Sequence, residues 1–311
     1  MILCCGEALI DFIASRDGLS YRPCPGGSIF NIAVGLGRME VPVGLLTHLS
    51  KDMFGDLLEN YLLKNSVSLD YCPRVAGQTT LAFVSLPDES TQEPRFAFYA
   101  EGAVDRSLTI NDLPKHIEDD VKAMHFGSIS LVLEPGATAL ETLMLRESRQ
   151  RILTLDPNVR PAVIPNREAY QQRFNKWVSL VDILRLSIAD LEYLYPDQSI
   201  DEIIPDWFNS GLSLIILTKG SEGAIAYTSS GLSAFVPARK VQVKDTVGAG
   251  DTFFSAALAY LYDHGLLDHK SSLAKMNLNC LEECLTFAGK AAAINCTREG
   301  ANPPFKNEMI L

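Results

Sequence analysis

The feature of this sequence that most restricts its fold is a series of short apolar runs separated by stretches of helical periodicity. The runs cover residues 43–46, 121–126, 152–155, 183–186 and 214–217. Continuous apolar runs are typical of strands buried on both faces, and their alternation with helices indicates a mostly parallel sheet flanked by helices. Polar or glycine residues follow each run, at the carboxyl end of its strand, where open α/β sheets bind ligands. The sequence therefore predicts an α/β fold with a binding site at that edge.

The first third of the chain departs from this alternation. Strand signals at residues 79–86 and 95–100, and a tight-hairpin signal at Asp17-Gly18, predict small antiparallel pairs instead. We expect these strands to form a small β-sheet lid, built from residues 12–25 and 71–104, that excludes water from the site. The main α/β domain then comprises residues 1–11, 26–70 and 105–311.

The charge and cysteine content narrow the classes of partner. The chain carries 27 Lys and Arg residues against 38 Asp and Glu residues, a formal net charge of −11. This balance argues against nucleic acid and anionic membranes as partners, although backbone N–H groups can still bind the phosphates of a nucleotide. Its seven scattered cysteines do not form the pattern of a disulfide framework. Since we find neither a signal-peptide pattern nor a membrane-length apolar run, we expect a cytoplasmic protein.

A glycine-rich turn late in the chain carries the strongest chemical signal. Gly248, Ala249 and Gly250 precede an apolar, helical stretch, so their unpaired N–H groups can bind an anion with help from the helix dipole. Asp251, in the first helical turn, could accept a proton from an attacking hydroxyl. By itself the turn fits equally well an ordinary helix start with an acidic first turn. It is neither a P-loop, because Asp251 replaces the lysine, nor a dinucleotide fingerprint.

Taken together with other segments, this turn resembles a known family. Residues 245–251 (DTVGAGD) resemble the signature of the PfkB, or ribokinase-like, sugar kinases. Four more segments match the family in order: 6–11 (GEALID), 26–31 (GGSIFN), 218–223 (TKGSEG) and 297–301 (TREGA). Residues 96–99, 156–160 and 300–304 look most like fructokinases. The resemblance implies a ribokinase-like fold, a central mostly parallel sheet flanked by helices with a small β-sheet lid. It also implies transfer of the ATP γ-phosphoryl group to a primary hydroxyl of a sugar, with fructose expected.

The resemblance assigns roles around the sugar. Asp251 would be the catalytic base, and the N–H groups of the glycine turn would stabilise the transferred phosphoryl group. The residues expected to bind the sugar are Asp11, Gly26, Gly27, Asn31, Phe98 and Arg160. Asp11 could accept bonds from two hydroxyls, whereas an aromatic residue such as Phe98 serves packing more often than ligand contact.

The resemblance also assigns a nucleotide side. The residues expected to bind ATP are Ser187, Thr218, Lys219, Gly220, Gly223 and Asn295. Asp190 would order water around Mg²⁺, in a Ser-x-x-Asp segment that departs from the family's Asn-x-x-Glu. Asp245 and the Val247 carbonyl match the family's monovalent-cation site. Pro304 stands where some relatives have serine, so a K⁺ effect is left open.

Several alternatives stay open at this point. The same chemistry could act on 2-keto-3-deoxygluconate, ribose or a nucleoside. For 2-keto-3-deoxygluconate, Arg95, Arg106 or Arg160 could bind the substrate carboxylate. A different class is a non-catalytic sugar or nucleotide sensor, against which the intact glycine turn and Asp251 argue. Because a small lid sheet has exposed strand edges, we also expect a homodimer that pairs through the lid.

Overall fold

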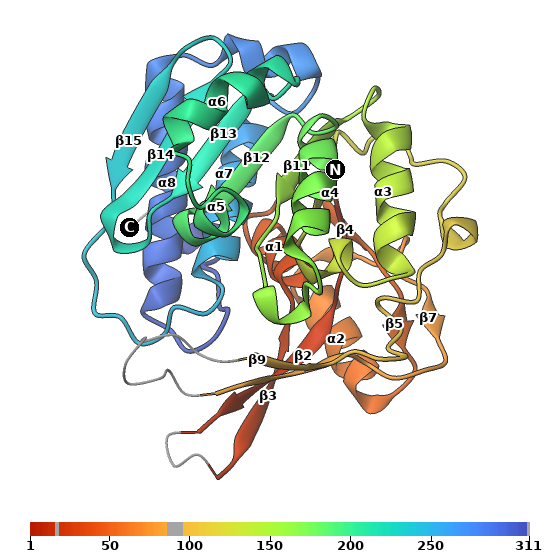
Figure 1. The fold of residues 1–311 in the computed structure, drawn as a ribbon. Helices are drawn as coiled ribbons and strands as arrows, with labels where there is room; N and C mark the ends of the chain where they lie inside the picture. Colours follow the sequence, from red (N-terminus) through yellow and green to blue (C-terminus); the bar gives the residue numbers. More distant parts are fainter. Residues whose placement is uncertain (16–18, 86–95, 310–311) are drawn as a thin grey trace.

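The computed structural model describes residues 1–15, 19–85 and 96–309. Among them, nine strands form one sheet (Figure 1). In spatial order these are β15 (Ser233–Pro237), β14 (Gly223–Thr228), β13 (Leu214–Thr218), β12 (Ile183–Ser187), β11 (Ile152–Asp156), β10 (Ala123–Gly127), β1 (Ile2–Cys5), β4 (Val43–Leu46) and β6 (Val67–Ser68). Neighbouring strands run parallel from β13 to β6, whereas β14 and β15 are antiparallel.

Helices cover both faces of this sheet (Figure 1). One face packs against α1 (Ser28–Arg38), α7 (Ala249–Asp263) and α8 (Leu278–Cys296). The other packs against α3 (Gly136–Glu147), α4 (Arg167–Val178), α5 (Ile188–Leu194) and α6 (Ile200–Asn209). Successive residues of a strand enter opposite cores: Cys4 belongs to the first and Cys5 to the second. Both faces are therefore buried, which explains the uninterrupted apolar runs in the sequence.

The remaining elements are short or peripheral. They are α2 (Met53–Lys64), the strand pair β5 (Leu49–Ser50) and β7 (Arg74–Val75), and the 3-10 helices η1 (Ile110–Asp112), η2 (Ser128–Leu131), η3 (Pro161–Val163), η4 (Gly220–Glu222), η5 (Lys270–Lys275) and η6 (Lys306–Met309). None of the helices in the described part of the chain combines the length and hydrophobicity that a membrane span requires.

Four further strands form the small separate sheet that the sequence predicted (Figure 1). Their order is β3 (Tyr21–Gly26), β2 (Leu9–Ala14), β8 (Leu81–Val84) and β9 (Phe96–Tyr99). One face of this lid sheet rests on the main domain, where Leu9 and Ala82 pack against Ile129. The hairpin signal at Asp17-Gly18 lies outside the described residues. The domain boundaries drawn from the sequence stay a prediction.

Candidate active site

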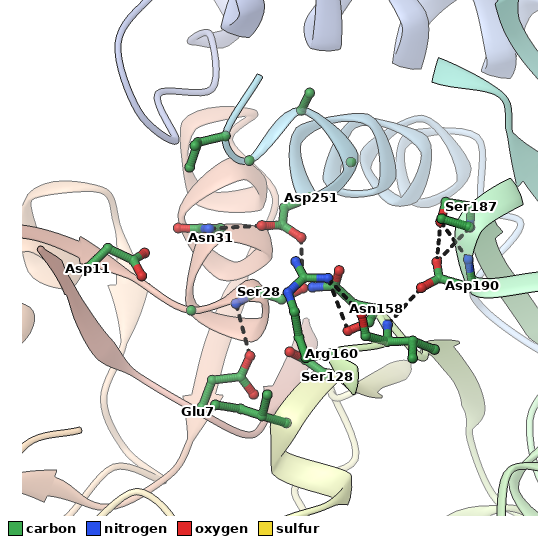
Figure 2. A pocket seen from close by; sticks show the side chains of 18 of the residues that line it. Glu7, Asp11, Ser28, Asn31, Ser128, Asn158, Arg160, Ser187, Asp190 and Asp251 are labelled. Atoms are coloured by element: carbon green, nitrogen blue, oxygen red, sulfur yellow. Dashed lines mark hydrogen bonds between the residues drawn. The ribbon is translucent and has the colours of Figure 1, made fainter. Parts of the chain in front are cut away.

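A cavity of about 580 Å³ opens between the lid sheet and the carboxyl ends of the parallel strands (Figure 2). Its size suits a small-molecule ligand. Many residues expected from the sequence line it: Asp11, Gly27, Asn31, Phe98, Arg160, Ser187, Asp190 and Val247 to Asp251. Gly26, Thr218, Lys219, Gly220, Gly223, Asp245 and Asn295 are not among its lining residues. The topology thus brings the sugar-side residues and the glycine turn to one place.

The glycine turn forms the N-terminus of α7. Gly248 has φ 70° and ψ 7°, and a Cβ there would lie 2.5 Å from the Cβ of Ala301, so only glycine fits. The Ala249 N–H, expected to contact phosphoryl, donates to the Thr246 carbonyl over 3.1 Å. Helix geometry leaves the amides of Gly250 and Asp251 without an intrahelical acceptor. The helix terminus is therefore suited to bind an anion.

Asp251 is held by two side chains from α1. The Ser28 hydroxyl donates to its Oδ1 over 2.7 Å, and the Asn31 amide donates to its Oδ2 over 2.8 Å. Burial raises the pKa of Asp251, against the opposing effect of these hydrogen bonds and of Arg160 and Arg185. The carboxylate is thereby fixed in orientation at the cavity wall (Figure 2). Asn31 also lines the cavity, and its expected bond to the sugar stays a prediction.

Glu7 lines the cavity, although the sequence did not single it out as a site residue. Its Oε1 accepts from the backbone N–H groups of Ser28 (2.9 Å) and Ile29 (3.4 Å), and Ser130 donates to its Oε2. Glu7 thus caps α1 from a distance, where the N-cap residue Gly27 has no side chain to do so. It fixes the helix that positions Asp251. The only signal was its place in the segment 6–11, which resembles the family.

Asp11 projects into the cavity from the lid strand β2 (Figure 2). Burial, and then the nearby charge of Asp251, raise the pKa of Asp11 to about 7, while Arg160 acts in the opposite direction. A Cβ on Gly26 would lie 2.1 Å from Asp11 Oδ2. The absence of a side chain at Gly26 therefore makes room for the Asp11 carboxylate.

A buried arginine lies directly behind the glycine turn. Arg185 Nη1 pairs with Asp156 Oδ2, and its Nη2 donates to Thr218 Oγ1, both over 2.6 Å. A Cβ on Gly250 would lie 2.8 Å from Arg185 Nη2. Arg185 also lines the cavity, so its guanidinium group, paired with Asp156 on one side, lies beside the anion-binding turn. Thr218, expected at the nucleotide, binds this guanidinium group. The sequence offered one signal for the role of Arg185: it is a charged residue inside the apolar run of residues 183–186.

Comparisons with known proteins agree with this geometry. The sequence profile described as pfkB family carbohydrate kinase matches residues 1–308. The chain belongs to the PfkB family of carbohydrate kinases.

Two relatives and one structure illustrate how close the match is. A fructokinase of Rhizobium leguminosarum bv. trifolii is 39% identical over 270 residues, covering 86% of this chain and 81% of that protein. Fructokinase-1 of Oryza sativa subsp. japonica is 31% identical over 318 residues, which cover 99% of this chain and 95% of that protein. The structure of a Xylella fastidiosa fructokinase with bound ATP is 29% identical and superposes with a TM-score of 0.88. The match covers 99% of this chain and 96% of that chain. The ribokinase-like fold and the sugar-kinase class expected from the sequence are confirmed.

The segment Ser187 to Asp190 of this PfkB kinase forms a capping box at the start of α5. Asp190 Oδ2 accepts from the Ser187 N–H (2.8 Å) and hydroxyl (2.6 Å), and its Oδ1 accepts from the Val159 N–H (2.7 Å). Both oxygens thus bind protein groups, yet the carboxylate borders the cavity (Figure 2). No cluster of three or more His, Cys, Asp or Glu side chains in the described ranges could hold a metal. Asp190 therefore suits an outer, water-mediated contact with Mg²⁺ better than direct coordination.

The other residues expected at the nucleotide lie on the β13–β14 connection of the kinase and in α8. Lys219 Nζ lies 3.6 Å from Glu222 Oε2. Gly220 adopts φ 56°. Gly223 has φ 127°, and a Cβ there would lie 2.1 Å from the Val236 carbonyl, so its conformation alone requires glycine. Asn295 is fully buried. The contacts of these residues with ATP stay a prediction.

Proposed function

We propose that this PfkB kinase transfers the γ-phosphoryl group of ATP to the primary hydroxyl of fructose, giving fructose 6-phosphate and ADP. The observation that carries the proposal is the buried Asp251 carboxylate, which Ser28 and Asn31 hold at the N-terminus of α7. Its position joins a proton acceptor to an anion-binding helix end within one cavity. The relatives named above are fructokinases, which supports fructose as the sugar.

In the proposed step, Asp251 accepts the proton of the sugar hydroxyl as the hydroxyl oxygen forms a bond to the γ-phosphorus. The bond from the γ-phosphorus to the bridging oxygen breaks, and the electron pair leaves with ADP. The amides of Gly250 and Asp251, which the helix leaves without an acceptor, and the Arg185 guanidinium group face the charge that develops on the phosphoryl oxygens. Phosphoryl transfer depends mainly on such positioning and charge stabilisation.

Around this step, other residues hold the ligands. Asp11 binds two sugar hydroxyls from the lid, with Arg160 beside it. Asp190 would hold a water of the Mg²⁺ ion that accompanies ATP, and the bound ion would neutralise phosphate charge. We place the reaction in the cytoplasm, where ATP and free sugars meet.

A sugar panel tests the proposal. ADP release would be followed with fructose, ribose, 2-keto-3-deoxygluconate and a nucleoside as acceptors. Fructose is expected to give the highest kcat/KM. Turnover of another acceptor with none of fructose would overturn the substrate assignment, and no turnover of any acceptor would favour a sensor.

The activity should depend on pH through Asp11. A carboxylate accepts two hydroxyls only when it is ionised, and the pKa of Asp11 is raised to about 7, mainly by burial. The kcat/KM for the sugar should therefore fall as the pH is lowered through about 7, well above the value of about 4 for an ordinary aspartate. In Asp11→Asn the inflection near pH 7 that belongs to Asp11 should disappear from this profile. An acid limb that Asp11→Asn leaves unmoved would contradict the role of Asp11.

We further propose a homodimer that pairs through the outer face of the lid. The rings of Phe12 and Phe83 stack there with centroids 4.9 Å apart, and those of Tyr21 and Tyr99 flank Phe83 at 5.4 and 5.5 Å. Tyr99 remains 66% exposed and Tyr21 44% exposed. Exposed aromatic clusters of this kind mark protein interfaces, and a second copy of the chain would cover them.

A charge introduced at the exposed edge of this cluster should dissociate the dimer. Tyr99→Asp is expected to weaken self-association by about tenfold or more, as loss of an aromatic anchor does. Sedimentation equilibrium would measure the dissociation constant. Leu145→Asp, at an equally exposed position on α3, is the control that should leave it unchanged. A wild-type protein that is monomeric at all concentrations tested would contradict the proposed dimer.

A further inference from the structure

The lid sheet is joined to the main domain by two chain segments that contact each other, one leading into β8 and one leaving β9. Gln78 in the first segment and Ala103 in the second form an isolated parallel bridge. Next to this bridge, the Val104 N–H donates to the Gln78 carbonyl over 2.9 Å. The chain therefore enters β8 and leaves β9 at one junction.

Two carboxylates bind adjacent threonines at this junction. Asp52, the N-cap residue of α2, accepts from the Thr79 N–H over 2.9 Å and from the Thr79 hydroxyl over 2.8 Å. The hydroxyl of the next residue, Thr80, donates to Asp105 Oδ1 over 2.6 Å. Because Asp105 belongs to the segment that follows β9, the Thr80–Asp105 bond crosses from one connection of the lid to the other.

Thr80 is also bonded to the strand that carries Asp11. It is fully buried, and its carbonyl accepts the N–H of Ile10 over 3.0 Å. Ile10 precedes Asp11 on β2, and β2 pairs with β8 directly after this bond. Neither Thr80 nor Asp105 is among the described residues that line the cavity. These two residues can therefore affect a bound sugar through the position of Asp11 and not by contact.

The charge of Asp105 strengthens its bond to Thr80. Burial raises the pKa of Asp105 to about 7, the Thr80 hydroxyl acts in the opposite direction, and the charge of Glu7 adds to the rise. The hydroxyl thus favours the ionised carboxylate, and hydrogen bonds to ionised groups are stronger than those between neutral groups. Loss of this donor would leave a buried acceptor without its partner, which is costly.

We propose that Thr80 and Asp105 are positioning residues of the sugar site, which fix β2 so that Asp11 is in place before the sugar binds. A site formed in advance avoids the entropic cost of ordering the lid on binding. Without the bond, Asp11 would be in place in only a fraction of the molecules, and the apparent affinity for the sugar would fall by that fraction. Asp251 is held separately, by α1, so the chemical step should not change. The inference rests on the proposed role of Asp11 in sugar binding.

Four variants test the bond in the ADP-release assay, with fructose or the best acceptor of the panel. Thr80→Val keeps the shape of the side chain but removes the hydroxyl, so the KM for the sugar should rise by about tenfold while kcat stays within about twofold. Thr80→Ser keeps the hydroxyl and should have a KM near that of wild type. Asp105→Ala should raise KM as Thr80→Val does, and the double variant Thr80→Val/Asp105→Ala should be little worse than either, because both changes remove one bond.

A matched control and a second readout complete the test. The Thr109 hydroxyl donates to Asp112 Oδ2 over 2.6 Å at η1, and neither residue is among those that line the cavity. Thr109→Val removes the same kind of bond and should leave KM unchanged. Hydrogen exchange follows β2 without turnover: the Ile10 amide should exchange faster in Thr80→Val than in wild type or Thr109→Val.

An unchanged KM in Thr80→Val, or a fall in kcat with KM unchanged, would overturn the inference. A wild type that turns over no acceptor would count against the proposed function. In that case the exchange measurement decides, because equal exchange of the Ile10 amide in wild type and Thr80→Val would show that the Thr80 hydroxyl does not fix β2.

Discussion

Replacing Asp251 with asparagine is expected to lower kcat by about 10²–10⁴-fold or more, the range for loss of a positioned general base. The amide has the same shape as the carboxylate, so the cavity should keep its form. Its oxygen can still accept from either Ser28 or Asn31, the two donors that hold Asp251. What it cannot do is take a proton from the sugar hydroxyl. The KM for the sugar should therefore change far less than kcat.

The measurement is the ADP-release assay under saturating sugar and ATP, together with the melting temperature of each variant. Asp263→Asn is the matched control, because Asp263 is the last residue of the same helix and forms a surface ion pair with Lys306. It should keep normal turnover. Near-normal kcat in Asp251→Asn would rule out Asp251 as the base, and the reaction would then need another proton acceptor.

Much of the fold could be predicted from the sequence because its strands are buried on both faces. Residues 43–46 form β4 with the bounds of the apolar run, and β11, β12 and β13 each extend their runs by a single residue. The strands of the lid were harder to delimit. The signals at residues 79–86 and 95–100 gave β8 and β9, which span four residues each, because side chains that are half exposed carry a weaker apolar pattern.

The contacts inside the site could not be predicted in the same way, because they join residues far apart in the chain. Ser28 and Asp251 are 223 positions apart, and no local pattern shows that a helix-start serine meets a helix-start aspartate. The motifs identified many, but not all, of the residues that gather in the cavity. They did not show that Asn31 and Thr218 bind other protein side chains, or that Glu7 caps α1.

Replacing Arg185 with methionine is expected to lower kcat by about 10³-fold or more, the effect of removing an arginine that faces the phosphoryl group. Arg185 lies against Gly250 and lines the cavity, so in the proposed reaction its charge would lie close to the negative charge that develops on the phosphoryl group. The variant should also be destabilised by roughly 3–5 kcal/mol, because it leaves Asp156 buried without its partner. Burial already raises the pKa of Asp156 to about 6, so without Arg185 this carboxyl group should take up a proton more readily.

A second substitution separates the loss of charge from the loss of stability. In Asp156→Asn/Arg185→Met the unpaired carboxylate is gone, so the free energy of unfolding should recover much of its loss while kcat stays low. Arg151→Met is the matched control: it breaks another buried ion pair, with Glu147, outside the cavity lining, and should lower stability without lowering kcat in the folded fraction. Recovery of kcat in the double variant would show that Arg185 only supports Asp156. A kcat that stays low in the double variant would show that the positive charge of Arg185 acts on the transferred phosphoryl group.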